Sequence, residues 1–157
     1  ALKETNNLCT TDKNFYPICF NNLGIPRCFM PQFENNQSFV EFEEALQNNN
    51  IDFENEEINP FLLRATQREI DSEKVFSIID KQLNDPSYFT EVIYKYNPIM
   101  VSNDNYVIDG HHRWASLLVY NLKYNKNEKL KIKKYNAPIR YLLKISNSLQ
   151  SIEFKDC

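Results

Sequence analysis

The sequence has little glycine, no long apolar run and no excess of positive charge. With only two glycines, few positions can adopt backbone conformations that other residues avoid. No apolar run approaches the roughly 20 residues of a membrane-spanning helix, so the chain is expected not to cross a bilayer. A net charge of −3 argues against a protein that coats nucleic acid through a broad basic face. A local patch could come only from the lysine-rich run 123–134, which is more simply explained as an exposed hairpin edge.

The sequence also lacks paired cysteines with the spacing of a metal site. The four cysteines stand near the two ends of the chain, at Cys9, Cys19, Cys28 and Cys157. No two are separated by only two residues, which disfavours a zinc site, whereas an even count predicts disulfides with three alternative connectivities. The chain begins at Ala1 rather than Met, as in a processed secreted protein or a trimmed chain. Together these features favour secretion or another oxidising compartment over the cytoplasm.

What the chain does contain is enough apolar material for one core. Its 157 residues suit a single domain, and 42% of them are hydrophobic, including 11 Phe and 9 Tyr. Residues 1–24 are polar and rich in Asn and Thr, and are expected to form an extended N-terminal arm. Residues 25–157 are expected to form the domain.

Apolar spacing and turn residues predict the elements of that domain. Helices are expected over residues 38–48, 72–83 and 111–122, and the tail from Lys144 onward is also expected to be helical. Strands are expected over residues 51–58, 98–102, 106–108, 130–135 and 138–143. Ser38 and Asp71 are the expected caps of the first two helices. The buried stripes should comprise Val75, Ile78, Ile79 and Leu83 in the second helix and Trp114, Leu117, Leu118 and Leu122 in the third. This order of elements predicts an α+β domain with a small mixed sheet flanked by helices.

Rare residues cluster at one point of the chain. One of the two glycines, both histidines and the single tryptophan lie in residues 110–114. A strand is expected to end at Ile108, Asp109 can cap the helix that follows, and Gly110 permits a sharp turn and close approach by a ligand. The first amides of such a helix lack intrahelical partners and lie at the positive end of its dipole. The loop 109–113 therefore predicts an anion site, with phosphate as its main candidate.

The side chains of this loop suit that ligand. Arg113 offers a planar, permanently charged group that matches phosphate oxygens. His111 and His112 can donate to those oxygens or move a proton near neutral pH. The alternative is purely structural: Asp109 only caps the helix, the histidines bond to neighbouring loops, and Arg113 lies on the surface.

Two acidic segments upstream could supply further groups. Thr66, Gln67 and Glu69 could line a cleft, with Glu69 acting as a base or holding a metal through water. Alternatively, Thr66 and Glu69 form a capping box at a helix start. The acidic stretch from Glu54 to Glu57 is typical of the solvated face of a strand, although one of its carboxylates could be catalytic.

Residues 107–115 resemble the signature of the ParB/sulfiredoxin superfamily, in the branch that carries Asp-Gly-His-His-Arg. Residues 98–102 and 63–71 are similar to that branch in order and spacing, so that the resemblance covers roughly residues 58–122. It implies a compact α+β domain that binds nucleotide phosphates at this loop. Members of the superfamily include DNA-binding partition proteins that hydrolyse CTP, proteins described as nucleases, ATP-dependent sulfiredoxins and free-serine kinases.

Differences between residues 109–113 and the motif of each branch reduce the number of functions that the resemblance implies. Sulfiredoxins carry Gly-Cys-His-Arg, and His111 stands in the place of their reactive cysteine, which disfavours sulfinic-acid repair. Partition proteins carry Gly-Glu-Arg-Arg and a helix-turn-helix domain beyond it, which is not expected in residues 123–157. The serine-kinase branch is similar throughout the loop. There an aspartate and an upstream glutamate serve catalysis, which would correspond to Asp109 and to Glu56, Glu57 or Glu69.

The function expected from the sequence is phosphate-ester chemistry, as a nucleotide-dependent phosphotransferase or nucleotide hydrolase. ATP, ADP or another nucleotide would bind with Mg²⁺ and react with a small-molecule acceptor. Asp109 would orient the metal or the acceptor, and a glutamate from residues 54–69 would be the base. One alternative is a metal-dependent nuclease that acts on nucleic acid with the same residues. The other is a module that binds phosphate or nucleotide without turnover.

Overall fold

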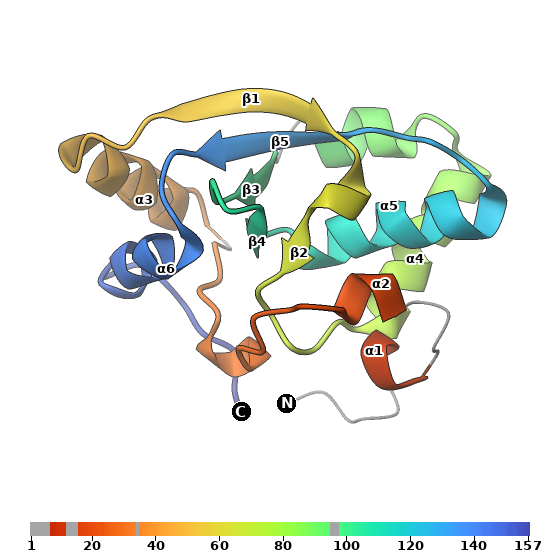
Figure 1. The fold of residues 1–157 in the computed structure, drawn as a ribbon, viewed down its shortest axis with the longest axis horizontal. Helices are drawn as coiled ribbons and strands as arrows, with labels where there is room; N and C mark the ends of the chain where they lie inside the picture. Colours follow the sequence, from red (N-terminus) through yellow and green to blue (C-terminus); the bar gives the residue numbers. More distant parts are fainter. Residues whose placement is uncertain (1–6, 12–15, 34, 95–97) are drawn as a thin grey trace.

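The computed structural model describes residues 7–11, 16–33, 35–94 and 98–157. At its centre is a five-stranded sheet in the order β1-β5-β3-β4-β2 (Figure 1). The strands are β1 (Phe53–Ile58), β2 (Arg64–Ala65), β3 (Ile99–Val101), β4 (Tyr106–Asp109) and β5 (Leu130–Tyr135). The β1–β5 and β3–β4 pairs are antiparallel, whereas β3–β5 and β2–β4 are parallel, so the sheet is mixed, as expected.

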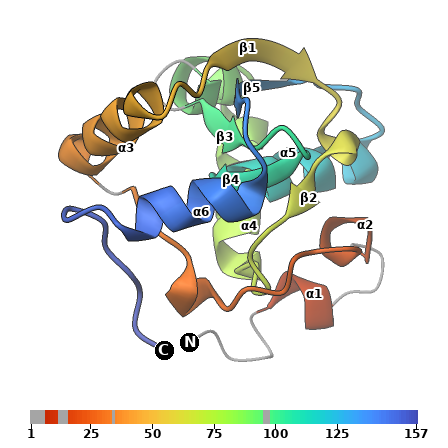
Figure 2. The ribbon, with the colours of Figure 1, turned by 60° about the vertical axis from the view of Figure 1, so that its left-hand side comes forward.

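Helices cover both faces of this sheet. The longer ones are α3 (Asn36–Asn48), α4 (Ser72–Asn84), α5 (His111–Tyr124) and α6 (Ile139–Asn147). The shorter ones are α1 (Leu8–Thr11), α2 (Tyr16–Cys19), η3 (Arg27–Phe29), η4 (Pro60–Leu62) and the π-helix η5 (Phe89–Tyr94). In two views α3 and α6 lie together on one side of the sheet, and α4 and α5 lie on the other (Figures 1 and 2). The expected α+β class is confirmed.

Alternation along the central strands produces two hydrophobic clusters. On β3, Ile99 and Val101 belong to the cluster on the α4–α5 side, and Met100 between them belongs to the α3–α6 side. On β4, Val107 and Ile108 divide in the same way. Since neighbouring residues of a strand point to opposite faces, both faces of the sheet are buried. The middle of the sheet, including the end of β4, is therefore held from two sides.

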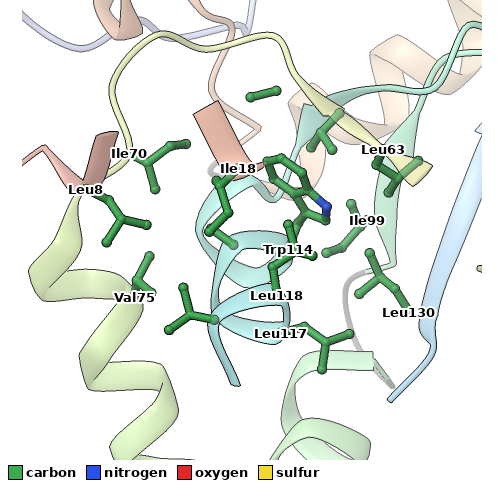
Figure 3. Packing of buried hydrophobic residues seen from close by; sticks show 14 of the residues in the cluster. Leu8, Ile18, Leu63, Ile70, Val75, Ile99, Trp114, Leu117, Leu118 and Leu130 are labelled. Atoms are coloured by element: carbon green, nitrogen blue, oxygen red, sulfur yellow. The ribbon is translucent and has the colours of Figure 1, made fainter. Parts of the chain in front are cut away.

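Trp114 packs at the centre of the larger cluster. Its side chain is fully buried and lies with Ile18, Ile99 and Leu118 in Figure 3. The indole Nε1 donates a hydrogen bond to the carbonyl oxygen of Pro60 at 2.8 Å. This residue thereby fixes the first turns of α5 against β3 and the segment that leads into β2.

Several predicted boundaries hold. Asp71 caps α4 by accepting a hydrogen bond from the amide of Glu73, and β5 coincides with its predicted range. The cap of α3, however, is Asn35 rather than Ser38, since the Asn35 side chain accepts from the amide of Ser38. Two predicted members of the buried stripes, Leu83 and Leu122, are 48% and 43% exposed.

The strand predicted over residues 138–143 is wrong, because this segment is the start of α6. Ile139, Tyr141 and Leu143 alternate as in a strand, but Tyr141 is exposed and the buried residues Ile139, Leu142 and Leu143 have helical spacing. The helix predicted from Lys144 onward is observed as far as Asn147. The lysine-rich run also differs from expectation. Its strand β5 lies between β1 and β3 rather than at an edge, and Lys133 forms an ion pair with Glu43.

The described part of residues 1–24 is not an extended arm. It contains α1 and α2, whose residues Leu8 and Ile18 are fully buried in the core. The amide of Leu8 donates to the carbonyl of Ile70 at 2.7 Å, and Cys9 and Cys19 form a disulfide that joins the two helices. Polar composition misled the prediction, since a few apolar residues and one disulfide are enough to fix this segment. Residues 1–6 and 12–15 of the predicted arm lie outside the described residues.

The disulfides select one of the three connectivities. Cys9 pairs with Cys19, and Cys28 pairs with Cys157 across 129 residues of sequence. Two disulfides are compatible with an oxidising compartment. Among the described residues, no helix has the length and apolar character needed to cross a membrane.

Replacing Trp114 by Phe should lower the free energy of unfolding by about 2–4 kcal/mol, because it leaves a gap in the core and removes the hydrogen-bond donor to Pro60. Urea unfolding followed by circular dichroism measures the loss. Leu122→Ala, on an exposed part of the same helix, is the control and should cost clearly less. Equal losses in the two variants would contradict the central role of Trp114.

Candidate functional site

A cleft of about 200 Å³ opens where β4 passes into α5. Residues 108–113 form one part of its wall. The remaining wall comes from distant segments, which contribute Arg27, Pro31, Gln32, Gln67, Lys74 and Lys155. Four cationic side chains and one carboxylate, Asp109, therefore line the cleft.

The turn into α5 depends on Gly110. Its backbone is left-handed, with φ 98°, a conformation that side chains disfavour. A Cβ at this position would also meet Arg113 Nη2 at 2.8 Å and Ile99 Cγ1 at 3.2 Å. Gly110 is itself the N-cap and offers no side-chain acceptor to the first amides of α5. The predicted capping role of Asp109 is thus wrong, because Asp109 is the last residue of β4.

Asp109 instead pairs with Arg113, one helical turn further on. Their Oδ2 and Nη2 atoms are 3.4 Å apart, and the two side chains are 29% and 19% exposed. Burial raises the pKa of Asp109 above its usual value, and the positive charge of Arg113 opposes that shift. Burial in turn lowers the pKa of Arg113, opposed by Asp109. Each group thus supports the charge of the other in a poorly solvated place.

His111 is committed to the fold through its ring nitrogen. Its Nε2 accepts hydrogen bonds from the backbone amides of Thr66 at 3.0 Å and Gln67 at 3.2 Å. A nitrogen that accepts cannot carry a proton, so the hydrogen bonds assign the neutral tautomer protonated at Nδ1. Burial lowers the pKa of His111 to about 3, and the neighbouring His112 adds to that shift.

His112 makes a similar hydrogen bond to the loop 66–71, the segment that also contains Thr66 and Gln67. Its Nε2 accepts from the backbone amide of Asp71 at 3.1 Å. Burial lowers its pKa to about 3, with added repulsion from the charges of Arg27 and Lys74. Both imidazoles are therefore neutral at pH 7. These low pKa values argue against proton transfer by the imidazoles near neutral pH, and the hydrogen bonds to a neighbouring loop match the structural alternative.

The loop 66–71 is secured by side chains that were expected to bind ligand. Thr66 is buried, does not line the cleft, and donates through Oγ1 to the carbonyl of Val107 at 2.6 Å. Gln67 does line the cleft, and its Nε2 donates to the carbonyl of Glu69 at 2.6 Å. The proposed capping box of Thr66 and Glu69 is wrong, since Asp71 caps α4.

Of the three candidate glutamates, Glu56 and Glu57 lie on β1 and Glu69 lies in the loop 66–71. Glu69 is largely buried beside the cleft, where its Oε2 accepts from the backbone amide of Arg27 at 2.7 Å and its Oε1 pairs with Arg68 at 3.0 Å. Glu57 is exposed on the edge strand β1, opposite Lys131, with β5 and β3 between it and β4. The structure does not bring Glu57 to the cleft. It gives Glu69 the task of fixing the backbone at Arg27.

Sequence reasoning missed three of the four cations. Lys74 stands in the first turn of α4, directly after the loop that the histidines hold, and could have been placed from that order. Arg27 and Lys155 come from opposite ends of the sequence, and the structure joins their segments through the Cys28–Cys157 disulfide and the bridge between Gln32 and Glu153. No local pattern indicates that they meet at residues 109–113.

The donor set fits phosphate oxygens better than a metal held by protein. Within the described ranges, no group of three or more His, Cys, Asp or Glu residues could hold a metal ion. The single carboxylate of the cleft already pairs with Arg113 and has a raised pKa. Backbone amides, guanidinium and ammonium groups, by contrast, are the usual partners of phosphate.

Comparison of the chain with protein-family models, with curated proteins and with solved structures gives no match.

The buried histidines predict that stability falls with acid. Unfolded histidine titrates near pH 6.5, whereas the folded values are about 3, so between these pH values the unfolded chain binds more protons. The free energy of unfolding should therefore decrease as the pH falls from about 6.5 toward 3. Asp109 acts in the opposite sense, because its pKa is raised in the fold. A variant that keeps Asp109 has the same contribution, which therefore cancels when the variant is compared with the wild type.

His111→Gln isolates the effect, since glutamine offers an acceptor but does not titrate. Urea unfolding at pH 5 and pH 6 should give the wild type a steeper dependence than the variant, by about 1.4 kcal/mol per pH unit. Identical slopes would show that His111 is not held neutral.

Proposed function

We propose that the protein binds the phosphate of a nucleotide or other phosphorylated molecule in this cleft and acts on a phosphate ester, as a phosphotransferase or hydrolase. The observation that carries the proposal is the charge of the cleft. Four cations and one carboxylate surround the start of a helix whose N-cap is glycine. Such a site attracts a compact anion with several oxygens.

Each part of the wall has a definite task in this proposal. The first amides of α5 lie at the positive end of the helix and would donate to phosphate oxygens. The Arg113 guanidinium has five N–H donors, so it can keep Asp109 as a partner and still bind phosphate. Gly110 leaves room for the Arg113 side chain, because a Cβ at position 110 would lie 2.8 Å from Arg113 Nη2 and would displace the guanidinium from the cleft.

Asp109 is the group proposed for proton transfer. It is the carboxylate that lines the cleft, and its raised pKa makes it a stronger base than an ordinary surface aspartate. It would accept the proton of an acceptor hydroxyl or water as the phosphoryl group is transferred. Neither Glu57, which lies elsewhere, nor Glu69, which holds Arg27, shares this task in the proposal.

The resemblance of residues 107–115 to the Asp-Gly-His-His-Arg branch of the ParB/sulfiredoxin superfamily supports the same function. ATP or ADP with Mg²⁺ is the ligand implied by it and the first to test. The cationic side chains that line the cleft favour recognition of the phosphates of such a ligand.

Specific observations favour two other functions. Two disulfides support a secreted protein, and nucleotide cofactors are scarce outside cells, which favours a nuclease using the same cations on a phosphodiester. The commitment of both imidazoles and Glu69 to structural bonds favours a module that binds without turnover.

Binding can be tested by a thermal-shift screen of nucleotides and phosphorylated metabolites, with and without Mg²⁺. A true ligand at about 100 times its Kd should raise Tm by about 5–10 °C. Arg113→Gln should weaken binding by about 10- to 100-fold, because a charged pair of donors is lost. Arg140→Gln, an exposed residue of α6 with the same charge change, is the control and should bind as the wild type does. Unchanged binding in Arg113→Gln would overturn the site assignment.

Catalysis can be separated from binding with Asp109→Asn, which keeps the shape of the side chain and removes its charge. Binding of phosphate ligands should be unchanged or tighter, whereas turnover should fall by about 10²–10⁴-fold. Hydrolysis of nucleotides, transfer to small acceptors and cleavage of DNA and RNA are the assays. Full turnover in the variant would exclude Asp109 as the base. Tight binding with no turnover in the wild type would identify the binding module.

A further inference from the structure

Two segments from opposite ends of the chain form a strap beside the cleft. The strap comprises residues 27–32 and 153–157, joined by the Cys28–Cys157 disulfide and by a hydrogen bond of 2.9 Å from the amide of Gln32 to the carbonyl of Glu153. In both views the C-terminal end of the chain lies next to the segment that carries η3 (Figures 1 and 2).

The strap is anchored to the loop that forms part of the cleft. Glu69 accepts from the backbone amide of Arg27 at 2.7 Å. Just before the strap, the carbonyl of Ile25 accepts from the amide of Arg68 at 2.8 Å, and Ile25 forms a bridge with Gln67. Because Glu69 is largely buried, this bond holds the strap firmly in register with the loop 66–71.

The anchored strap contributes two cations to the cleft, Arg27 and Lys155. Arg27 lies near enough to His112 to lower the pKa of that imidazole, as does Lys74 of α4. The positive charges of the cleft thus come from α5, from α4 and from the strap. They do not all come from the loop 109–113.

The positive charge that lines the cleft is greater than a single phosphate group requires. A phosphate monoester carries about −2 at pH 7, whereas four cations and one carboxylate line the cleft. A ligand of higher negative charge would match the four cationic side chains of the lining better, since each added negative charge is attracted by all of them.

We propose that the strap forms a second phosphate subsite, so that the cleft selects ligands with two or more linked phosphates over a single phosphate. This inference rests on the proposed function and specifies its ligand class. Arg27 and Lys155 are specificity-determining residues in it. Glu69 acts as a positioning residue, because it fixes the backbone from which Arg27 extends.

Titration calorimetry at low salt with orthophosphate, pyrophosphate and tripolyphosphate tests this. The wild type should bind pyrophosphate and tripolyphosphate at least about tenfold more tightly than orthophosphate. Lys155→Gln should weaken pyrophosphate and tripolyphosphate by about 5- to 10-fold and orthophosphate by less than about twofold. Lys144→Gln, an exposed lysine of α6 outside the cleft, is the matched control and should change none of these affinities.

The double variant Cys28→Ser/Cys157→Ser tests the strap itself and should show the same selective loss while Arg113 remains in place. If it does not fold, Lys155→Gln alone decides, since that exposed side chain can be changed without disturbing the core. Equal affinities for all three probes in the wild type, or equal proportional losses in Lys155→Gln, would overturn the second subsite and leave the proposed function intact. Failure of the wild type to bind any of the three would overturn both.

Discussion

Two neutral imidazoles hold the parts of this site together. His111 and His112 extend from the first turn of α5, and their Nε2 atoms accept backbone amides of the loop 66–71. A buried backbone amide that loses its partner is costly, so these bonds fix the distance between the loop and the helix. They also require both rings to stay unprotonated, which their low pKa values allow at neutral pH.

The rest of the cleft follows from that contact. Once the loop is held, Gln67 lines the cleft and Glu69 can accept the amide of Arg27, which places the strap. The Cys28–Cys157 disulfide then adds the C-terminal segment and Lys155. Residues from four parts of the sequence thus meet at the start of α5, although only residues 108–113 are contiguous.

The charges of the cleft can be gathered because a rigid core supports them. The sheet is buried on both faces, and Trp114 ties α5 to the segment before β2 through its bond to Pro60. A packed interior resists relaxation, so like charges can be kept closer than a flexible surface would keep them. The pairing of Asp109 with Arg113 reduces the repulsion, and a polyanionic ligand would reduce it further.

The sequence alone determined the position of the candidate site and the class of the fold. The cluster of rare residues at 110–114 and the change from strand to helix spacing at Gly110 are local signals, and local signals are what a sequence displays. The alternating strands and the helices α3, α4 and α5 were found for the same reason. The first part of α6 was taken for a strand because Ile139, Tyr141 and Leu143 also alternate, whereas its end from Lys144 was expected to be helical.

Tertiary structure alone decided what the residues of the site do. Whether a histidine carries a proton depends on its burial and on the groups that its nitrogen atoms face, and the amides of Thr66 and Asp71 lie about 40 residues upstream. Whether a glutamate is a base or an anchor depends in the same way on its neighbours, and Glu69 is an anchor. The disulfide pairing and the approach of Arg27 and Lys155 to the cleft are contacts between opposite ends of the chain. No spacing within a sequence encodes such contacts, since they arise only when separate segments pack against one core.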